Sequence, residues 1–521
     1  MNYFELFRVT LPETALEIAA LLVLVVDLLF LNKAALKVRV ASAAMLGVVG
    51  CAVAGWALQF AAGQEYSFEG ALLLAARGYV TVAQAGILVL TAITLLLLIE
   101  ETFTKHIGEF VAVMLMAAAG GLIVAAAQDL LVIFVGLELL SLCLYIMTAF
   151  AKTSGKSAEA AIKYYLFGGM SAAFLLFGFS YFYGLTGSTN LAEIQTSIAL
   201  QGTSPLFYVA WVLVVAGLGF KVAAVPFHLW APDTYEGAPA PAAAFIASVS
   251  KVASFALLLT IGSNWLTLQP GSTFGLVGLG MWLHTVDRNW TQLAVLLFIL
   301  AAISMVVGNL AALAQVSVRR LLAYSAIAHA GYMLLGVATL PHYSGTLADL
   351  HLIPSRLISV ELSANAVLYY VITYGLTTIG AFGVVAVVER ATGSDKMDAF
   401  LGLHKRNPLL AAVLLVLFLS LAGIPPLVGF WAKFNLFAAV LNVGAGPVPF
   451  SLVGLAIALS AVSLYYYLQV LKRAWVMPAV DDSPIKAHPV TMVVLVGIGL
   501  AVVVLGCFPT LLQGWIESAY R

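Results

Sequence analysis

Long apolar runs recur along the whole chain and are separated by short polar segments. A transmembrane helix needs about 20 mostly apolar residues, and the runs of this length predict about fourteen spans. Helices are expected because lipid cannot hydrogen-bond to backbone groups and no strand-like alternation of apolar and polar positions accompanies the runs. The predicted fold is an all-α integral membrane protein with spans at 14–31, 41–60, 78–98, 109–127, 129–150, 160–184, 206–227, 239–263, 291–314, 320–340, 365–388, 408–437, 449–471 and 489–515.

The composition supports a surface that faces lipid. Hydrophobic residues make up 63% of the 521 positions and charged residues only 9%, whereas soluble domains have about 25% charged residues. The net charge is zero, so a basic surface for nucleic acid is excluded. The cysteines Cys51, Cys143 and Cys507 lie in apolar runs without metal-ligand spacing. No metal site and no haem, iron–sulfur, nucleotide or flavin motif is expected.

The basic residues predict an orientation in the membrane. Fifteen of the 24 lie in one set of alternate loops and only five in the opposite loops and ends. The positive-inside rule places the richer set in the cytoplasm and both termini outside. The richer set is Lys33, Lys37, Arg39, Lys105, Lys152, Lys156, Arg319, Arg320, Arg390, Lys396, Lys405, Arg406, Lys472, Arg473 and Lys486, and the poorer set is Arg8, Arg77, Arg288, Arg356 and Arg521.

The remaining four basic residues, Lys163, Lys221, Lys251 and Lys433, fall inside predicted spans. A lysine at the bilayer centre costs about 2.5–3.5 kcal/mol on insertion scales, and such residues usually mark ion or proton pathways. Glu138 lies near the middle of its span among aliphatic neighbours. A single Glu–Lys pair could simply lock two helices together, but here the buried cations outnumber the obvious acid. We therefore favour proton transfer over a structural pair.

Two spans carry proline next to a buried lysine. The seventh contains Lys221 and Pro226, and the twelfth contains Gly423, Pro425 and Lys433. Proline removes a backbone donor and clashes with the preceding turn. Unwound backbone at membrane depth is tolerated only inside protein or against water. We expect both helices to be broken, although a simple packing kink is the alternative for each.

The two breaks lie five spans apart, which suggests two five-helix units. An odd number of spans per unit makes the second repeat inverted, and inverted repeats with paired broken helices are typical of transporters. The expected organisation is a three-helix segment at 1–108, a first repeat at 109–263, a second repeat at 291–471 and a C-terminal helix within 489–521.

His329 lies in the predicted span at 320–340. A lone histidine in an apolar helix is most often a hydrogen-bonded packing residue, but its place between Lys251 and Lys433 makes a proton-relay role equally plausible. Asp27, inside the first span, and the 263–290 connection receive no role from the sequence.

Seven segments around these residues form recognisable motifs, namely GFK (219–221), VPFHLWAPD (225–233), GAPAP (237–241), SKVA (250–253), RRLLAYS (319–325), GY (331–332) and LSLAGIP (419–425). They resemble the motifs of a known family, the antiporter-like subunits of respiratory complex I and of multisubunit cation/proton antiporters. The resemblance covers about 109–475 and is most like subunit N of bacterial NADH-quinone oxidoreductase. Lysine at both 251 and 433 favours subunit N, whereas the prolines at 425 and 426 depart from the single proline that is usual.

The resemblance implies roles for individual residues. By motif, Glu138 matches the key glutamate of the family and Lys221 its key lysine. Lys251 matches the bridging lysine, Lys433 the exit lysine, and Lys163 a lysine that modulates the glutamate. The resemblance also implies that this subunit has no redox cofactor, and that NADH, FMN, iron–sulfur clusters and quinone bind in partner subunits.

These patterns lead to one expected function and two alternatives. We expect a subunit of NADH:quinone oxidoreductase in the bacterial inner membrane that couples quinone reduction elsewhere to proton pumping. Its partners would be the other membrane subunits of the complex and the lipid bilayer. The alternatives are a subunit of a multisubunit cation/proton antiporter and a passive membrane scaffold.

Overall fold

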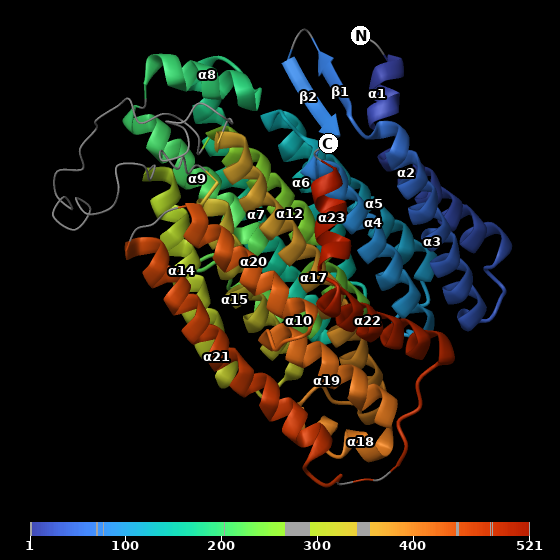
Figure 1. Ribbon diagram of the computed structural model, residues 1–521. Helices are drawn as coiled ribbons and strands as arrows, with labels where there is room; N and C mark the ends of the chain where they lie inside the picture. The colour runs from blue at the N-terminus through green and yellow to red at the C-terminus, as the bar shows by residue number, and fades with distance from the viewer. Residues whose placement is uncertain are drawn as a thin grey trace.

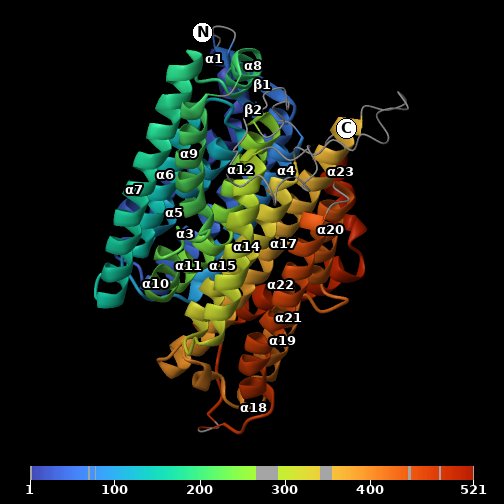
Figure 2. The same ribbon diagram turned by 90° about the vertical axis from the view of Figure 1, so that its left-hand side faces the viewer.

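The computed structural model describes residues 3–68, 71–76, 78–202, 204–265, 292–340, 355–443, 447–479, 481 and 483–519. The helices form a bundle in which the two halves of the chain lie side by side, as Figure 2 shows. The short helices near the two chain ends, α1 (Tyr3–Val9) and α23 (Thr510–Ser518), lie toward the same end of the bundle in Figure 1. The opposite end carries α18 (Leu403–Arg406).

The N-terminal segment contains α2 (Leu11–Val25), a π-helical turn (Val26–Phe30), α3 (Leu36–Ala61), β1 (Gln64–Phe68), β2 (Ala71–Ala76), α4 (Tyr79–Leu97) and a 3-10 turn (Leu98–Glu100). It is followed by α5 (Ile107–Ala126), α6 (Leu130–Thr148), α7 (Gly155–Thr186), α8 (Leu191–Gln201), α9 (Pro205–Val222), α10 (Trp230–Gly237), α11 (Ala240–Ala247) and α12 (Val249–Trp265).

The second half of the described chain begins with α14 (Gln292–Leu313), α15 (Val318–Ala338) and α17 (Ser355–Thr392). A 3-10 turn (Met397–Phe400) and α18 precede α19 (Pro408–Ala422), α20 (Val428–Val443), α21 (Pro447–Trp475), α22 (Pro489–Cys507) and α23. The 263–290 connection, for which no role was predicted, lies outside the described residues from 266 onward.

Local sequence signals explain where many helices begin. Asp129 precedes α6, and its carboxylate accepts hydrogen bonds from the backbone N–H groups of Leu131 and Val132. Such caps satisfy the backbone donors that the first turn of a helix leaves without partners. Side chains of Ser154, Asn190, Ser204, Ser317, Asn407 and His488 cap α7, α8, α9, α15, α19 and α22 in the same way.

Twelve helices of the described chain are long and apolar enough to cross a membrane. Two further predicted spans, 14–31 and 408–437, are built from shorter pieces, namely α2 with its π-helical turn and α19 with α20. The all-α membrane fold is therefore confirmed, and the count of fourteen spans stays a prediction. Large apolar side chains such as Leu21, Leu166 and Phe177 are exposed on the outside of the bundle, where lipid would contact them.

One difference from the helical expectation is the β1–β2 hairpin. The two strands pair antiparallel, with a register irregularity between Tyr66 and Ser67. The hairpin lies at one end of the bundle in Figure 1, and in the chain it connects α3 to α4. A hairpin is compatible with the apolar pattern because it connects spans and does not cross the membrane.

The first predicted span contains an ion pair that gives Asp27 a partner. The Arg39 guanidinium donates from Nε to Asp27 Oδ1 at 2.7 Å and from Nη2 to Oδ2 at 2.6 Å. Bidentate pairs of this kind are strong and directional. Gly108 on α5 lies against the Asp27 side chain, so close that an added Cβ would be 2.6 Å from it. The pair therefore joins the π-helical turn after α2 to α3, beside Gly108 on α5.

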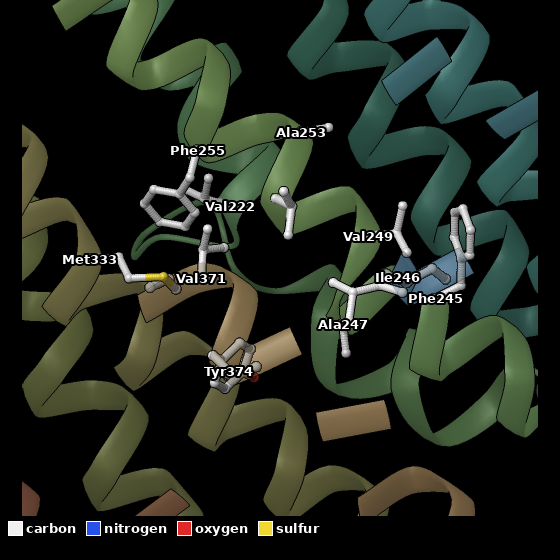
Figure 3. Close-up of a cluster of buried hydrophobic side chains, with 14 of the residues drawn as sticks. Val222, Phe245, Ile246, Ala247, Val249, Ala253, Phe255, Met333, Val371 and Tyr374 are labelled. Atoms are coloured by element: carbon white, nitrogen blue, oxygen red, sulfur yellow. The ribbon is translucent and has the colours of Figure 1, made fainter. Parts of the chain in front are cut away.

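Helices α12, α15 and α17 lie in the middle of the bundle, between the two halves of the chain. Figure 3 shows the apolar cluster where the end of α9 meets these helices, with Val222, Met333, Val371 and Tyr374 around it. The buried ionisable residues of the central bundle must therefore find partners within protein rather than in solvent.

Candidate functional site: a row of buried ionisable side chains

The first broken helix ends where the sequence predicts. Helix α9 stops at Val222, Ala223 adopts a left-handed conformation, and the chain resumes as α10 at Trp230. The interruption leaves carbonyl groups of the last α9 turn without helical partners. The Trp230 indole donates to the Phe220 carbonyl at 3.0 Å. A buried side chain thus compensates part of the break.

Lys221 lies in the last turn of α9 and points to α6. Its ammonium donates a hydrogen bond to Ser141 Oγ at 2.5 Å, and the Phe220 ring centroid lies 5.6 Å away. Ser141 is three residues beyond Glu138 on the same helix, which places both on one face. Glu138 and Lys221 interact electrostatically, although Ser141 provides the direct contact. Lys221 therefore contacts Ser141, whose hydroxyl donates to the Leu137 carbonyl, and Glu138 acts on the lysine only through its charge.

Lys251 is almost completely buried, with 1% of its surface exposed. Its ammonium donates to the Ala326 carbonyl on α15 at 2.7 Å and to the Val222 carbonyl at 3.5 Å. The Val222 carbonyl belongs to the residue after Lys221, so Lys251 contacts the first break directly. The Tyr374 ring lies 5.7 Å from the Lys251 nitrogen, within the range of cation–π attraction.

His329 connects Lys251 with the second half of the chain. Its ring is 3% exposed, and Nδ1 is 2.8 Å from the Tyr370 hydroxyl. The rings of Tyr374 and Tyr332 pack against it, with centroid distances of 4.8 and 5.7 Å. Because Tyr374 also faces Lys251, one aromatic ring separates the lysine from the histidine.

The second broken helix holds Lys433 in a different way. Helix α19 ends at Ala422, Gly423 has a φ of 89°, and α20 begins at Val428. The Lys433 ammonium donates to the Leu421 carbonyl at 3.1 Å, the Ala422 carbonyl at 2.8 Å and Ser460 Oγ at 2.7 Å. Its exposed fraction is 6%. The carbonyls freed by the break thus bind the lysine that follows it.

Tyr332 completes the row between His329 and Lys433. Its ring centroid is 5.6 Å from the Lys433 nitrogen, and it also packs on the His329 ring. A small cavity of about 10 Å³ lies between His329, Tyr374 and Leu421, which is near the lower limit for one water molecule. The order across the bundle is therefore Lys221, Lys251, His329 and Lys433, with tyrosine rings between the last three.

Lys163 lies apart from this row. It is partly exposed and forms ion pairs with Asp233 at 2.7 Å and with Glu159 at 2.6 Å. Arg320 also binds Asp233, at 2.6 Å. Burial pushes the Asp233 pKa upward, but the hydrogen bonds from Lys163 and Arg320 outweigh it and hold this pKa below its usual value. In this conformation Lys163 forms its ion pairs with Asp233 and Glu159 and not with Glu138.

Several residues of the site could not be singled out from the sequence. Ser141 and Ser460 bind the two lysines at the breaks, and Tyr370 and Tyr374 surround His329. The one available signal was spacing, because Tyr370 and Tyr374 are four residues apart on α17 and so share a face. Serine in an apolar helix is too common to mark a site by itself.

A cavity of about 180 Å³ lies on another face of α20, lined by Asn365, Asn435, Asn442, Gln513 and Glu517. Apolar side chains such as Leu362 and Ile516 line it as well, and it adjoins α23, near the end of the bundle that carries the termini. Among the described residues no group of three or more His, Cys, Asp or Glu side chains is arranged to hold a metal ion.

A multi-helix membrane bundle with two broken helices and a buried row of lysines defines an antiporter-like membrane subunit. The family described as NADH:quinone oxidoreductase/Mrp antiporter, TM, matches residues 127–267 and 260–458. The chain belongs to this family.

Relatives point to one branch of the family. The chain is 45% identical to NADH-quinone oxidoreductase subunit N 2 of Acidobacterium capsulatum, over 99% of both chains. It is 38% identical to subunit N of Desulforamulus reducens, over 78% of this chain and 76% of that one. The predicted resemblance to subunit N is confirmed.

Solved structures agree. A chain of respiratory complex I from Thermus thermophilus with bound aureothin is 32% identical, with a TM-score of 0.74 over 96% of this chain and 98% of that one. A chain of the Mrp complex from Dietzia sp. DQ12-45-1b has a TM-score of 0.78 at 21% identity, over 98% of this chain and 52% of that one, and shows the fold alone. The homologues of this chain are thus subunits of multisubunit membrane complexes.

Proposed function

We propose that this chain is the subunit N-type proton-translocating membrane subunit of an NADH:quinone oxidoreductase, in which quinone reduction elsewhere drives proton movement here. The enzyme activity belongs to the whole complex, and the redox cofactors would be bound by partner subunits. The observation that carries the proposal is the row from Lys221 through Lys251 and His329 to Lys433, which runs between the two broken helices.

In the proposed mechanism Glu138 controls the charge of Lys221. At an effective dielectric constant of about 20, two unit charges interact by about 4 kcal/mol at 4 Å and by roughly 2 kcal/mol at about 8 Å. A movement of charge toward or away from Glu138 therefore changes the proton affinity of Lys221 by a useful amount. The released proton would pass to Lys251, then through His329 to the outlet lysine Lys433.

Lys163 is proposed to modulate this step through its choice of partner. When it binds Asp233 and Glu159, its charge is neutralised away from Glu138. If it turned toward Glu138, it would compete with Lys221 for the same carboxylate. In this role Lys163 would adjust the charge of Lys221 without carrying a proton along the relay.

The orientation proposed from the basic loops places the termini on the outer side of a bacterial inner membrane. Cysteines introduced at 154 and 394 should then react with an impermeant reagent only from the cytoplasmic face of sealed vesicles. Labelling from the outer face of intact cells would refute this orientation.

Glu138→Gln and Lys221→Ala test the relay in the assembled complex. Each variant should assemble but lose most coupled turnover, whereas Glu138→Asp should keep part of it because the charge remains and only the reach shortens. Inverted membrane vesicles allow NADH oxidation and proton uptake to be measured together. Normal rates of both in Glu138→Gln and Lys221→Ala would exclude the relay and favour a passive scaffold.

A cation/proton antiporter subunit remains the second candidate, because the family description includes Mrp antiporters and the fold is shared. Co-purification separates the two functions. Recovery with NADH dehydrogenase and quinone-site subunits supports the proposal, and recovery with antiporter subunits alone supports the alternative.

A further inference from the structure

A charged cavity opens at the end of the bundle that carries the basic loops. Its volume is about 360 Å³, and its walls come from α7, α10, α11, α15 and α17. Lys156, Arg319, Glu389, Arg390 and Glu101 line it. A cavity of this size with charged walls is polar and roomy enough to hold water, through which protons could reach its inner wall.

A second, smaller cavity lies deeper, between α4, α11, α17 and α22. Its volume is about 10 Å³, and Glu101, Ala240, Ala386 and Arg390 line both cavities. These four residues therefore form the wall between the two spaces. Glu101 is the carboxylate in that wall and is 9% exposed.

A buried hydroxyl faces the smaller cavity. Thr491 on α22 is 2% exposed, and its Oγ1 has no hydrogen-bond partner among the described residues. Buried polar groups are normally satisfied by protein or by ordered water. The hydroxyl and the cavity volume together fit one water molecule beyond Glu101.

The charges around Glu101 suit proton exchange. Burial raises the Glu101 pKa to about 7, against the attraction of Arg390 and Arg319 and with the repulsion of Glu389 and Glu100. The Arg390 guanidinium is 3.6 Å from Glu101 and 2.9 Å from Glu100. Because Glu100 holds Arg390 more closely, protonation of Glu101 does not leave the arginine without a partner.

Beyond the smaller cavity, one face of α17 continues toward the row. Ala386, Phe382, Thr378 and Tyr374 follow one another at four-residue spacing, so they lie along one side of the helix. Thr378 and Tyr374 bring hydroxyls into this buried face. Tyr374 is the residue whose ring faces Lys251 at 5.7 Å. The face thus leads from Arg390 to the middle of the row.

We propose that Glu101 is the proton-collecting residue of this subunit, taking protons from the charged cavity and passing them inward along α17 to the part of the row where Lys251 contacts the end of α9 beside Lys221. The Glu101 carboxylate accepts a proton from water in the larger cavity and donates it to water in the smaller one. After each transfer the residue is again an ionised carboxylate. This inference rests on the proposed proton-translocating function and names its uptake site.

Glu101→Gln in the assembled complex is the direct test, with Glu100→Gln as the matched control. Both substitutions remove a carboxylate beside Arg390, but only Glu101 lines the two cavities. Proton uptake by inverted vesicles should fall roughly tenfold in Glu101→Gln, less than the ~10²–10⁴-fold contribution of a positioned acid–base group because water still reaches the cavity. Glu100→Gln should stay near the wild-type rate.

Thr491→Val provides a second test, because valine has nearly the shape of threonine but lacks the hydroxyl. It should lower proton uptake by a smaller factor than Glu101→Gln. If Glu101→Gln does not assemble, a lowered uptake in Thr491→Val supports the proposal and a normal uptake overturns it. Normal uptake in Glu101→Gln, with Lys221→Ala still impaired, overturns the uptake site and leaves the proposed function standing. Normal uptake in Glu101→Gln and Lys221→Ala alike overturns both.

Discussion

The two broken helices place a lysine at the same kind of interruption but bind it by different chemistry. At the α9–α10 break Lys221 precedes the interruption and reaches away from it, to Ser141 and the neighbouring Glu138 on α6. At the α19–α20 break Lys433 follows the interruption and folds back on it, to the carbonyls of Leu421 and Ala422.

Because of this difference, the electrostatic environment of Lys221 can change, whereas that of Lys433 is fixed by its own broken helix. A carboxylate on another helix can be screened, moved or neutralised, so the charge of Lys221 can respond to events outside its own helix. The carbonyls at the end of α19 are fixed dipoles with partial negative charge, which stabilise a cation without titrating. The first break therefore suits regulation, and the second suits a fixed station for a proton.

The largest effect is expected from Lys433→Met, which removes the charge but keeps the length of the side chain. Coupled turnover should fall by about 10²-fold or more, the contribution typical of a positioned acid–base group. Lys472→Met on the exposed end of α21 is the control, because it removes a lysine outside the row. Equal turnover in the two variants, measured per assembled complex, would make Lys433 a structural residue.

A pair of serine variants compares the two lysines directly. Ser141→Ala removes the hydroxyl that binds Lys221, whereas Ser460→Ala leaves Lys433 with two carbonyl acceptors. A hydrogen bond to a charged group contributes about 1.5–3 kcal/mol, so Ser141→Ala should slow turnover more. An equal or larger loss in Ser460→Ala would contradict the proposed division between the breaks.

The backbone at the two breaks offers a smaller, structural comparison. Gly423→Ala forces a left-handed alanine, which costs about 1–2 kcal/mol, and its Cβ would lie 2.9 Å from Lys433 Cδ. Ala223 already adopts a φ of 60°. Glycine relieves the strain of this conformation but loses more backbone entropy on folding, so Ala223→Gly should raise the free energy of unfolding by at most about 1 kcal/mol. Thermal dissociation of the subunit from the purified complex measures both, and a loss in Ala223→Gly larger than in Gly423→Ala would contradict the comparison.

The smallest effect concerns the ion pairs beside the first break. The lowered Asp233 pKa means that its stabilisation is present above the ordinary value of 3.8 and is lost only as pH falls through the lower folded-state value. Asp233→Asn should therefore cost about 0.5–1 kcal/mol, as expected for partly exposed pairs, equally at pH 5 and pH 8. A cost that disappears on acidification from pH 8 to pH 5, measured by thermal dissociation, would show that the ion pairs are not its source.

The sequence was sufficient for features that one segment encodes by itself. Apolar length predicted the helices, and proline beside lysine predicted breaks in the spans 206–227 and 408–437. In the structure α9 ends at Val222 and α19 at Ala422. At the second break, the sequence predicted unwound backbone that lies inside protein or against water. The structure lets the freed carbonyls and the ammonium satisfy each other, which depends on how α20 returns beside α19.

Features that need distant partners could not be predicted. Lys163 finds Asp233 seventy residues away, and Asp27 finds Arg39 across a turn whose geometry the apolar pattern does not specify. The tyrosines around His329 become meaningful only when α15 and α17 pack together. The repeat boundaries remain a prediction for the same reason, because they describe a relation between two halves with weak sequence similarity.

Lys251 connects the two halves of the proposed relay. It binds the Val222 carbonyl of the first break and faces Tyr374, whose ring packs on His329. The most direct measurement is the proton uptake per NADH oxidised by vesicles that contain assembled Lys251→Met complex. The proposed relay predicts that uptake falls together with turnover, because a proton leaving Lys221 has no acceptor. Wild-type turnover with an unchanged proton-to-electron ratio would contradict the relay.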